Sequence, residues 1–372
     1  MALRIALASP TPSPSRETFV DAHIRGLDKV ELVLSDGALP YFNGRGEPLV
    51  VPSIFDRILG LVHTVDTRQQ RRDGIVRLLK KEGIDVLLAE YGSAGAELHG
   101  ICRSAGVPIV PVFHGYDAYR EDMLKRYGVY KELFAGASRI VAVSHAMAEQ
   151  LKAVGAPEEK LVYNPCGADL GIFTCGDATK APPHFVTIGR FVDKKAPHLT
   201  ILAFERVVRS RPDARLTMIG DGELLEACVQ LVRALKLTDK VDLCGRKDQA
   251  WIGEALLRSR AFVQHSLVTS ANDREGTPVA VLEAMAAGLP VVSTRHGDIV
   301  EMVKHGERGL LCAEGDIEGM AENMLKLVDD APLAGLMGRA GSTYVRTEHG
   351  VERRASELQN ILQEVVDENT KR

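Results

Sequence analysis

The sequence has no long apolar run. No stretch approaches the ~18 consecutive apolar residues that a membrane-spanning helix requires. The run from Met1 to Pro10 is too short for a signal peptide and is instead predicted to form a first strand. These absences predict a soluble globular protein.

Cysteine pairs and an excess of charge of one sign are also absent. The six cysteines show no CxxC spacing and no Cys/His cluster, so reduced thiols in a cytoplasmic protein are expected rather than disulfides or a zinc site. The net charge is −4, and residues of both signs are interspersed along the chain. This balance excludes a nucleic-acid-binding protein with a basic face.

A glycine-rich dinucleotide motif is missing as well. The first predicted strand is followed by the stretch Ser9-Pro-Thr-Pro-Ser-Pro-Ser-Arg-Glu17, not by G-x-G-x-x-G. The absence of this motif therefore argues against an NAD-dependent dehydrogenase.

What is present is an alternation of short β-rich runs with helical patterns, which is typical of parallel α/β units. The predicted strands fall into two sets, 4–9, 30–34, 85–89, 108–113, 139–143 and 160–163, then 184–188, 216–219, 241–244, 261–264, 291–294 and 309–312. A chain of 372 residues is longer than the length that usually folds around a single hydrophobic core. We therefore predict two domains, 1–175 and 176–350, followed by a last helix within 351–372.

Two glutamates flank a predicted helix start in Glu275-Gly-Thr-Pro-Val-Ala-Val-Leu-Glu283. Thr277 suits the N-cap and Pro278 the first helical position. The free amides that follow, with the helix dipole, form an anion site, and carboxylates accept hydrogen bonds from sugar hydroxyls. The combination indicates a sugar nucleotide. The alternative is that Glu275 is an ordinary acid near a helix start and Glu283 a solvated helix residue.

Cations and glycines follow the strands of the second set. Arg190 and Lys195 come after its first strand and would offset the two charges of a diphosphate, although surface cations are often only solvated. Gly220-Asp-Gly222 is predicted to form a tight turn. Gly245 ends the next strand and would let a nucleotide base approach the backbone.

In the first set, two polar residues follow the strand 108–113. His114 and Asp117 would face the crevice where open α/β sheets bind ligands, beyond the carboxyl ends of the strands. The alternative for His114 is a hydrogen bond to the backbone without a chemical role. Ser144, after the next strand, is predicted to cap a helix over 146–153.

Several of these stretches together resemble retaining family 4 glycosyltransferases of the GT-B fold, over nearly the whole chain. They are Gly189-Arg190 with Lys195, Gly220-Asp-Gly222, and the run from Glu275 to Val292. Within that family, three further stretches are most similar to the colanic-acid type of bacterial exopolysaccharide glycosyltransferase. These are Phe113 to Asp117, Ser144 to Met147, and Ser13 to Phe19.

The resemblance implies an α/β fold with two Rossmann-like doubly wound domains facing across a cleft. The donor would be held mainly by the second domain and the acceptor mainly by the first, and the last helix would pack back on the first domain. Arg190 and Lys195 match the pair that binds the donor diphosphate and stabilises the leaving group. Glu283 matches the acid that holds the ribose hydroxyls.

The resemblance also implies contacts at the sugar. Glu275, with the backbone around Gly276, Thr277 and Pro278, matches the part that contacts the donor sugar and phosphate. His114 matches the histidine that reaches over the donor sugar near the reacting carbon. Arg190, Lys195, Glu275 and His114 are thus the expected catalytic residues.

The acceptor side is less defined by the sequence. Many family members carry glycines in the loop after the first strand, which here is Pro/Ser-rich, and Glu17 and Thr18 are expected to bear on the acceptor together with Asp117. The segment from Arg68 to Lys81 is basic and partly amphipathic. It would suit an anionic membrane surface and a polyprenyl-diphosphate-linked acceptor; the alternative is a solvated helix face.

The expected activity is that of a retaining hexosyltransferase for cell-surface polysaccharide or glycolipid biosynthesis. The donor would be UDP- or GDP-linked and the acceptor a saccharide or lipid-linked saccharide. The sequence contains no Asp-x-Asp, so a metal-independent enzyme without cofactor is expected, cytoplasmic and at the inner face of the membrane. Two alternatives stay open, a 2-epimerase-like enzyme and a non-catalytic sugar-nucleotide-binding subunit.

Overall fold

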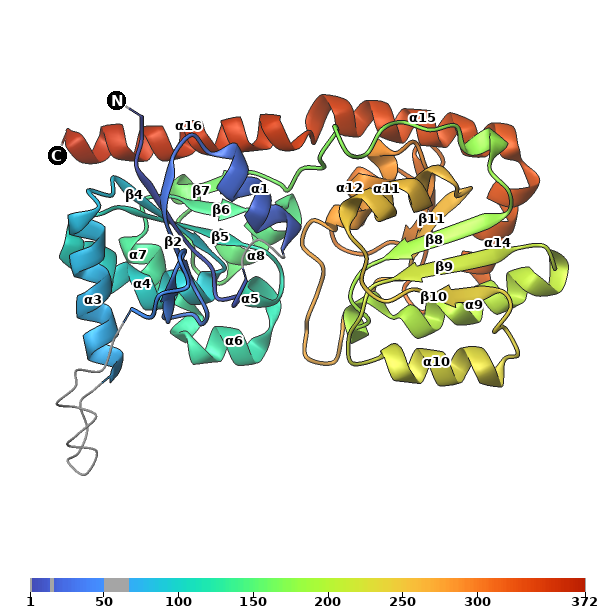
Figure 1. Ribbon diagram of the computed structural model, residues 1–372, viewed down its shortest axis with the longest axis horizontal. Coiled ribbons are helices and arrows are strands. Elements are labelled where there is room, and N and C mark those ends of the chain that lie inside the picture. Colours follow the sequence, from blue (N-terminus) through green and yellow to red (C-terminus); the bar gives the residue numbers. More distant parts are fainter. Residues whose placement is uncertain (1, 14–16, 50–66, 372) are drawn as a thin grey trace. The chain divides into compact units, whose positions relative to one another are not determined.

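The structure is a computed structural model that describes residues 2–13, 17–49 and 67–371 (Figure 1). The predicted similarity over Ser13 to Phe19 therefore lies partly outside the described residues. The chain divides into two compact units, unit 1 with Met1–Pro165 and Arg354–Arg372, and unit 2 with Cys166–Arg353. This division falls earlier in the chain than the predicted boundary at residue 175.

Unit 1 contains a seven-stranded sheet in the order β3-β2-β1-β4-β5-β6-β7, parallel except for the β2–β3 pair. Its strands are β1 Ile5–Ala8, β2 Val30–Ser35, β3 Phe42–Asn43, β4 Val86–Glu90, β5 Ile109–Phe113, β6 Ile140–Ala142 and β7 Leu161–Tyr163. Every strand predicted for this set is present. The two-residue strand β3 was not predicted, because it is too short to show a periodic pattern.

The helices of unit 1 cover this sheet and connect its parallel strands. They are α1 Thr18–Gly26, α3 Thr67–Lys81, α4 Gly92–Ala105, α5 Tyr116–Tyr119, α6 Glu121–Arg126, α7 Lys131–Gly136 and α8 His145–Ala153. Ser144 caps α8 as predicted, because its hydroxyl accepts a hydrogen bond of 2.9 Å from the Met147 amide. The central strands β4 and β5 are buried throughout, as expected for strands covered on both faces.

Unit 2 contains a six-stranded parallel sheet in the order β10-β9-β8-β11-β12-β13. Its strands are β8 His184–Ile188, β9 Arg215–Ile219, β10 Val241–Leu243, β11 Ala261–Gln264, β12 Val291–Thr294 and β13 Gly309–Cys312. All of them were predicted. The strand order reverses between β8 and β11, so the loops after these two strands flank the point where doubly wound sheets bind ligands.

Helices lie on both faces of the unit 2 sheet (Figure 1). They are α9 Pro197–Ser210, α10 Leu225–Ala234 and α14 Ile317–Asp329 on one face, and α11 Gln249–Leu257 and α12 Val279–Ala286 on the other. Helix α15, Ala331–Glu348, contributes residues to the cores on both faces. The short helix α13 spans Ile299–Met302. Two apolar cores result, one on each side of the sheet.

The last helix, α16, spans Val351–Thr370. Its buried residues Ala355, Leu358 and Leu362 recur every three or four positions and form one apolar stripe. Within unit 1, Ala355 packs so closely on Gly26 that a Cβ at residue 26 would lie 2.6 Å from the Ala355 Cβ. Glycine is therefore required on α1 for this approach.

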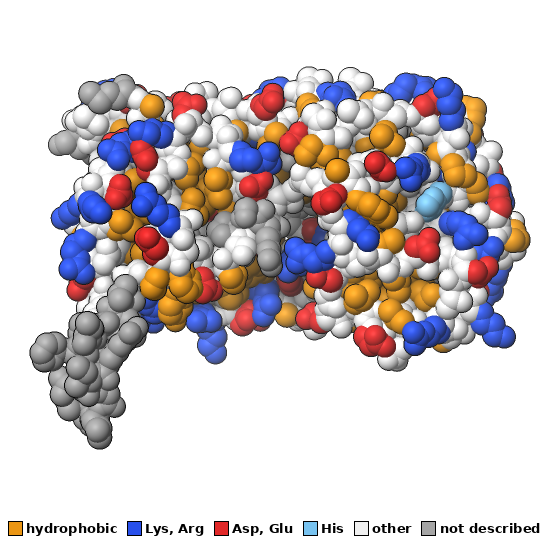
Figure 2. Space-filling view, in the orientation of Figure 1, with side chains coloured by type: hydrophobic (Ala, Val, Ile, Leu, Met, Phe, Trp, Pro, Cys, Tyr) orange, Lys and Arg blue, Asp and Glu red, His pale blue; other side chains and the backbone are white. Residues whose placement is uncertain are grey.

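Charged side chains of both signs are interspersed on the face of each unit shown in Figure 2. Over the part of the chain that the structure describes, no helix is long and apolar enough to cross a membrane.

Candidate active site

Glu275 lies in unit 2 on the loop 265–278, which joins β11 to α12. Its side chain is 8% exposed, and Oε2 lies 3.2 Å from the Lys195 ammonium nitrogen. Burial alone would raise the pKa of Glu275, but the charges of Lys195 and Lys194 outweigh it and lower the pKa to about 2. The other oxygen, Oε1, is buried and has no hydrogen-bond partner among the described residues. An ionised oxygen left in this state is ready to accept a ligand hydroxyl, because an unmade buried hydrogen bond costs about 1–3 kcal/mol.

Two adjacent lysines hold this loop. Lys195 also donates to the side-chain oxygen of Gln264, at 3.4 Å. Lys194 is buried and donates to the Asp273 carboxylate at 3.0 Å and to the Arg274 carbonyl at 3.1 Å. Sequence reasoning singled out Lys195 and missed Lys194, whose partners lie about 80 residues away in a loop that only the folded sheet brings close.

Arg190, by contrast, extends from the loop after β8 into solvent. Its side chain is exposed, and it makes no ion pair with any described residue. Arg190 and Lys195 both line a small cavity that also contacts Gln264 and Met218. The structure therefore brings the two predicted diphosphate-binding cations to one place.

Glycines let the neighbouring loops close together around this cavity. Gly220 has φ +141°, and a Cβ there would lie 1.9 Å from the Gly189 carbonyl oxygen. The Gly220 amide also donates to the Gly245 carbonyl at 2.9 Å. A Cβ at Gly245 would meet no atom within 4 Å. Open space thus lies beside the residue predicted to face a nucleotide base.

The helix start differs by one residue from the prediction. Helix α12 begins at Val279, and Pro278 is its N-cap with ψ 95°, so Thr277 is not the cap and Pro278 is not the first helical residue. The extended ψ of Pro278 delays the first helical turn. Proline has no hydrogen-bonding side chain, so it does not cap the first amides of the helix itself.

Glu283 lies in α12 and is 6% exposed. Burial raises the pKa of Glu283 to about 7, against the opposing charge of Lys195. The alternative of a solvated helix residue is therefore wrong for Glu283. Glu275 is likewise buried, and it is ion-paired with Lys195; its role at a ligand stays a prediction.

A histidine on the next strand end supports the loop from behind. His296 accepts the Glu275 amide hydrogen at Nε2, at 3.1 Å, and its Nδ1 lies 2.6 Å from Glu314. Because Nε2 accepts, Nδ1 must carry the hydrogen and donate it to Glu314. Glu314 also accepts from the Val268 amide at 2.9 Å. These residues follow the neighbouring strands β12 and β13, which was the only sequence signal that could have indicated them.

His296→Ala is expected to lower the free energy of unfolding by about 1–3 kcal/mol, because the buried Glu275 amide would lose its acceptor. Urea unfolding measures this change. Lys304→Ala is the matched control on the same unit, since its ion pair with Glu307 is exposed and is worth at most ~1 kcal/mol. Equal unfolding midpoints for the two variants would contradict this role of His296.

In unit 1, His114 follows β5 and contacts a carboxylate. Its Nε2 lies 2.6 Å from Oε2 of Glu90, the last residue of β4. The other oxygen of Glu90 lies 2.7 Å from Nδ1 of His23 on α1. Glu90 is fully buried. Sequence reasoning identified His114 and missed both Glu90 and His23.

Asp117 lies beneath the loop after β5 in unit 1. Its side chain is fully buried, and its carboxylate accepts hydrogen bonds from the amides of Gly92, His114 and Gly115 at 2.8–3.1 Å. A carboxylate occupied in this way holds the loop after β5 against the start of α4. Asp117 thus positions the backbone at His114, and its role on the acceptor side stays a prediction.

The other two acceptor-side candidates lie at the start of α1. Glu17 accepts hydrogen bonds from the Tyr91 hydroxyl at 3.1 and 3.2 Å, and Thr18 is the exposed first residue of the helix. Their contact with an acceptor remains a prediction.

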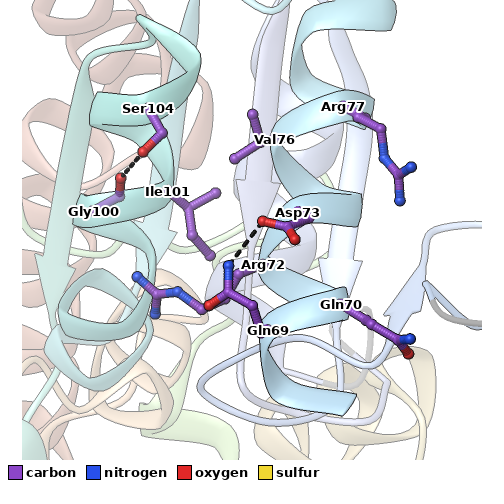
Figure 3. Close-up of a pocket in the computed structure, with 9 residues that line it drawn as sticks. All are labelled: Gln69, Gln70, Arg72, Asp73, Val76, Arg77, Gly100, Ile101 and Ser104. Atoms are coloured by element: carbon purple, nitrogen blue, oxygen red, sulfur yellow. Dashed lines mark hydrogen bonds between the residues drawn. The ribbon is translucent and has the colours of Figure 1, made fainter. Parts of the chain in front are cut away.

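A separate groove lies between α3 and α4, where the side chains of Val76 and Ile101 face each other (Figure 3). No predicted site residue lines it. The basic residues of α3 partly have partners within unit 1, since Arg68 pairs with Glu97 and Arg71 lies 3.8 Å from the centre of the Tyr41 ring. Membrane contact of this helix therefore remains a prediction.

Comparison with known proteins assigns the family. The model described as "Glycosyltransferase Family 4" matches residues 30–171, and the model described as "Glycosyl transferases group 1" matches residues 177–343. The chain belongs to the family 4, group 1 glycosyltransferases. The predicted membership of glycosyltransferase family 4 is thus confirmed.

Relatives of this glycosyltransferase carry names that refer to the biosynthesis of colanic acid and amylovoran. The putative colanic acid biosynthesis glycosyltransferase WcaL of Salmonella typhimurium is 30% identical over 69% of this chain and 65% of its own length. The amylovoran biosynthesis glycosyltransferase AmsK of Erwinia amylovora is 33% identical over 65% of this chain and 61% of its own length. The chain thus matches slightly less than two thirds of the length of these relatives.

A solved structure confirms the GT-B fold of this glycosyltransferase. HepE of Anabaena, crystallised with UDP and glucose, superposes with a TM-score of 0.76 at 16% identity, covering 97% of this chain and all of that one. At this identity the similarity concerns the fold alone.

Proposed function

We propose that this chain is a retaining glycosyltransferase that moves a sugar from a nucleoside-diphosphate sugar to a hydroxyl of a saccharide or lipid-linked saccharide. The observation that carries the proposal is the buried, ionised Glu275, whose Oε1 has no partner among the described residues, beside Lys195 and the exposed Arg190. The names of WcaL and AmsK support a role in exopolysaccharide synthesis.

The diphosphate of the donor would bind between cations and the start of α12. Arg190 and Lys195 supply positive charge, and the helix dipole adds to it. Glu283 would accept hydrogen bonds from the ribose hydroxyls, and the open space at Gly245 would take the base. Breaking the bond from the anomeric carbon to the phosphate oxygen develops negative charge on the diphosphate. Preorganised cations therefore stabilise the transition state more than the bound substrate.

In unit 2 the sugar would be held by Glu275 through Oε1. Glu275 is engaged with Lys195, so it orients the sugar and does not act as a nucleophile. The acceptor hydroxyl would attack from the side of the leaving group. Its oxygen bonds to the anomeric carbon as the carbon–phosphate oxygen bond breaks, and the departing diphosphate takes the hydroxyl proton. This course retains the anomeric configuration.

A ligand screen tests the proposal. Thermal-shift and calorimetric titrations with UDP, GDP and their common sugar conjugates are expected to give at least one ligand that raises the melting temperature, since a ligand at 100 times its Kd stabilises the folded state by about 2.7 kcal/mol. The hit then serves as donor with lipid-linked saccharide acceptors, and NMR of the product reports its anomeric configuration.

Two results would reject the proposed function. Absence of binding to every nucleotide in a folded sample would point to a non-catalytic subunit that supports a partner enzyme. An isomerised nucleotide sugar formed without acceptor would point to an epimerase.

A further inference from the structure

Lys194 is a buried cation beside the candidate site that the proposed chemistry does not yet use. Its ammonium nitrogen lies 3.0 Å from the Asp273 carboxylate and 3.1 Å from the Arg274 carbonyl oxygen, and its side chain is 9% exposed. Desolvation offsets most of the attraction within a buried ion pair, so such a pair adds little net stability. Stability alone therefore does not account for a charged side chain at this position.

A strained turn of the backbone brings two adjacent lysines to the same loop, 265–278. Residues Asp193–Lys195 form a single 3₁₀ turn, and the next residue, Ala196, is fully buried with φ +35°. A left-handed conformation is strained for a residue with a Cβ, and such strain clusters at functional sites. Gly189 leaves room for the second lysine, because a Cβ there would lie 2.8 Å from Cδ of Lys195. The strain thus occurs where the turn delivers both ammonium groups to the candidate site.

The two lysines balance two carboxylates of this loop. Lys194 pairs with Asp273 at 3.0 Å, and Lys195 pairs with Glu275 at 3.2 Å. Burial raises the pKa of Glu275, but the charges of Lys195 and of Lys194 together lower it to about 2, so the charge of Lys194 also acts on this second carboxylate. Without Lys194, one lysine would face two carboxylates. The loop would then present a net negative charge that repels an incoming anion.

Lys195 has a hydrogen-bond donor to spare for a ligand. An ammonium group carries three N–H donors. Among the described residues, two of those of Lys195 are directed at the side chains of Glu275 and Gln264, and the third can donate to a phosphate oxygen. For Lys195 to lend its positive charge to a diphosphate as well, the carboxylate of Glu275 needs a second counter-ion. Lys194 is placed to supply it.

We propose that Lys194 is a positioning residue that keeps the charge of Lys195 available to the donor diphosphate. It neutralises Asp273 and holds the backbone directly before Glu275. Because Lys194 is buried and engaged with these groups, it acts through them and not by contact with the ligand. The inference deepens the proposed function and rests on it for the identity of the ligand, a diphosphate.

Removing the charge on each side of the ion pair tests this role. Calorimetry on the full chain measures the Kd of UDP, GDP and inorganic pyrophosphate, the last of which carries a diphosphate without base or sugar. Lys194→Met keeps most of the apolar stem and removes the charge, so it should weaken diphosphate binding about tenfold. Asp273→Asn removes the opposite charge and should tighten binding about threefold. The double variant restores the charge balance and should bind within about threefold of the wild type.

A role for Lys194 in loop structure alone predicts a different pattern. Asp273→Asn would then also lose the ion pair and weaken binding, and the double variant would bind no better than Lys194→Met. That pattern would overturn the proposal, as would wild-type affinity of Lys194→Met. Lys304→Met removes an exposed lysine of unit 2 that pairs with Glu307 and controls for the loss of one positive charge. It should leave each Kd unchanged, and a loss equal to that of Lys194→Met would also overturn the proposal.

The proposed function and this inference fail in different ways. If the wild type binds none of the three ligands, the proposed function fails and the inference fails with it. If the wild type binds a diphosphate and Lys194→Met binds it equally well, only the inference fails. If Lys194→Met does not fold, Asp273→Asn decides: tighter binding than wild type supports the role of Lys194, and unchanged or weaker binding overturns it.

Discussion

Replacing both Arg190 and Lys195 by alanine is expected to slow sugar transfer by about a thousandfold or more. One preorganised group that stabilises developing negative charge is typically worth about 100- to 1,000-fold in kcat, and the two cations flank the same small cavity. Transfer rates at saturating donor measure the loss. A double variant with near-wild-type turnover would reject the diphosphate assignment.

The two single variants separate catalysis from stability. Arg190 is exposed and makes no ion pair with a described residue, so Arg190→Ala should leave the melting temperature unchanged while lowering kcat. Lys195→Ala also removes the partner of the buried Glu275. It should therefore lower the melting temperature as well, because removing one partner leaves a buried charge uncompensated. Arg209→Ala, an exposed helix pair with Glu205, controls for loss of positive charge.

Glu283→Gln is expected to weaken nucleotide binding and yet to stabilise the ligand-free protein. Two hydrogen bonds from ribose hydroxyls to a carboxylate would be replaced by contacts to a neutral amide. The loss should be about 10- to 100-fold in Kd, measured by calorimetry at pH 8. An unchanged Kd would exclude the ribose role.

The opposite effect on stability follows from the pKa of Glu283, which burial raises to about 7 from an ordinary 4.5. In the folded state the group keeps its proton up to about pH 7, whereas the unfolded chain releases it near pH 4.5. The stability this provides is present below pH 4.5 and is lost as pH rises to about 7. Glu283→Gln should thus raise the melting temperature above wild type at pH 8 more than at pH 5. Equal differences at the two pH values would contradict the raised pKa.

Most of the strands could be predicted because each buried parallel strand is a short apolar run of sequence between two turns. Strand β3 could not be predicted, because a two-residue strand is too short to show an alternation of apolar and polar residues. At α12 the local signals favoured Thr277 as the cap, but the backbone at Pro278 places the helix start one residue later. Such boundaries depend on a single backbone angle, which composition does not determine.

The residues of the candidate site also fall into those that the sequence could predict and those that it could not. Glu275, Glu283, Arg190, Lys195 and His114 lie in short local stretches of sequence and were identified from them. The groups that hold them did not belong to a motif. Lys194, His296 and Glu90 act through contacts 21 to 80 residues apart in sequence. Which residues meet over such separations depends on which strands become neighbours, and that order is a property of the folded sheet.

The anchoring of the loop 265–278 has a consequence for the thermodynamics of donor binding. Lys194 holds Asp273, the Lys194 carbonyl accepts from the Leu267 amide, and His296 holds the Glu275 amide. The conformational entropy of this segment is therefore given up when the chain folds and not when the donor arrives. Donor association then needs little further ordering of this loop, so its entropy term reflects water and ions released from the diphosphate more than loss of chain motion.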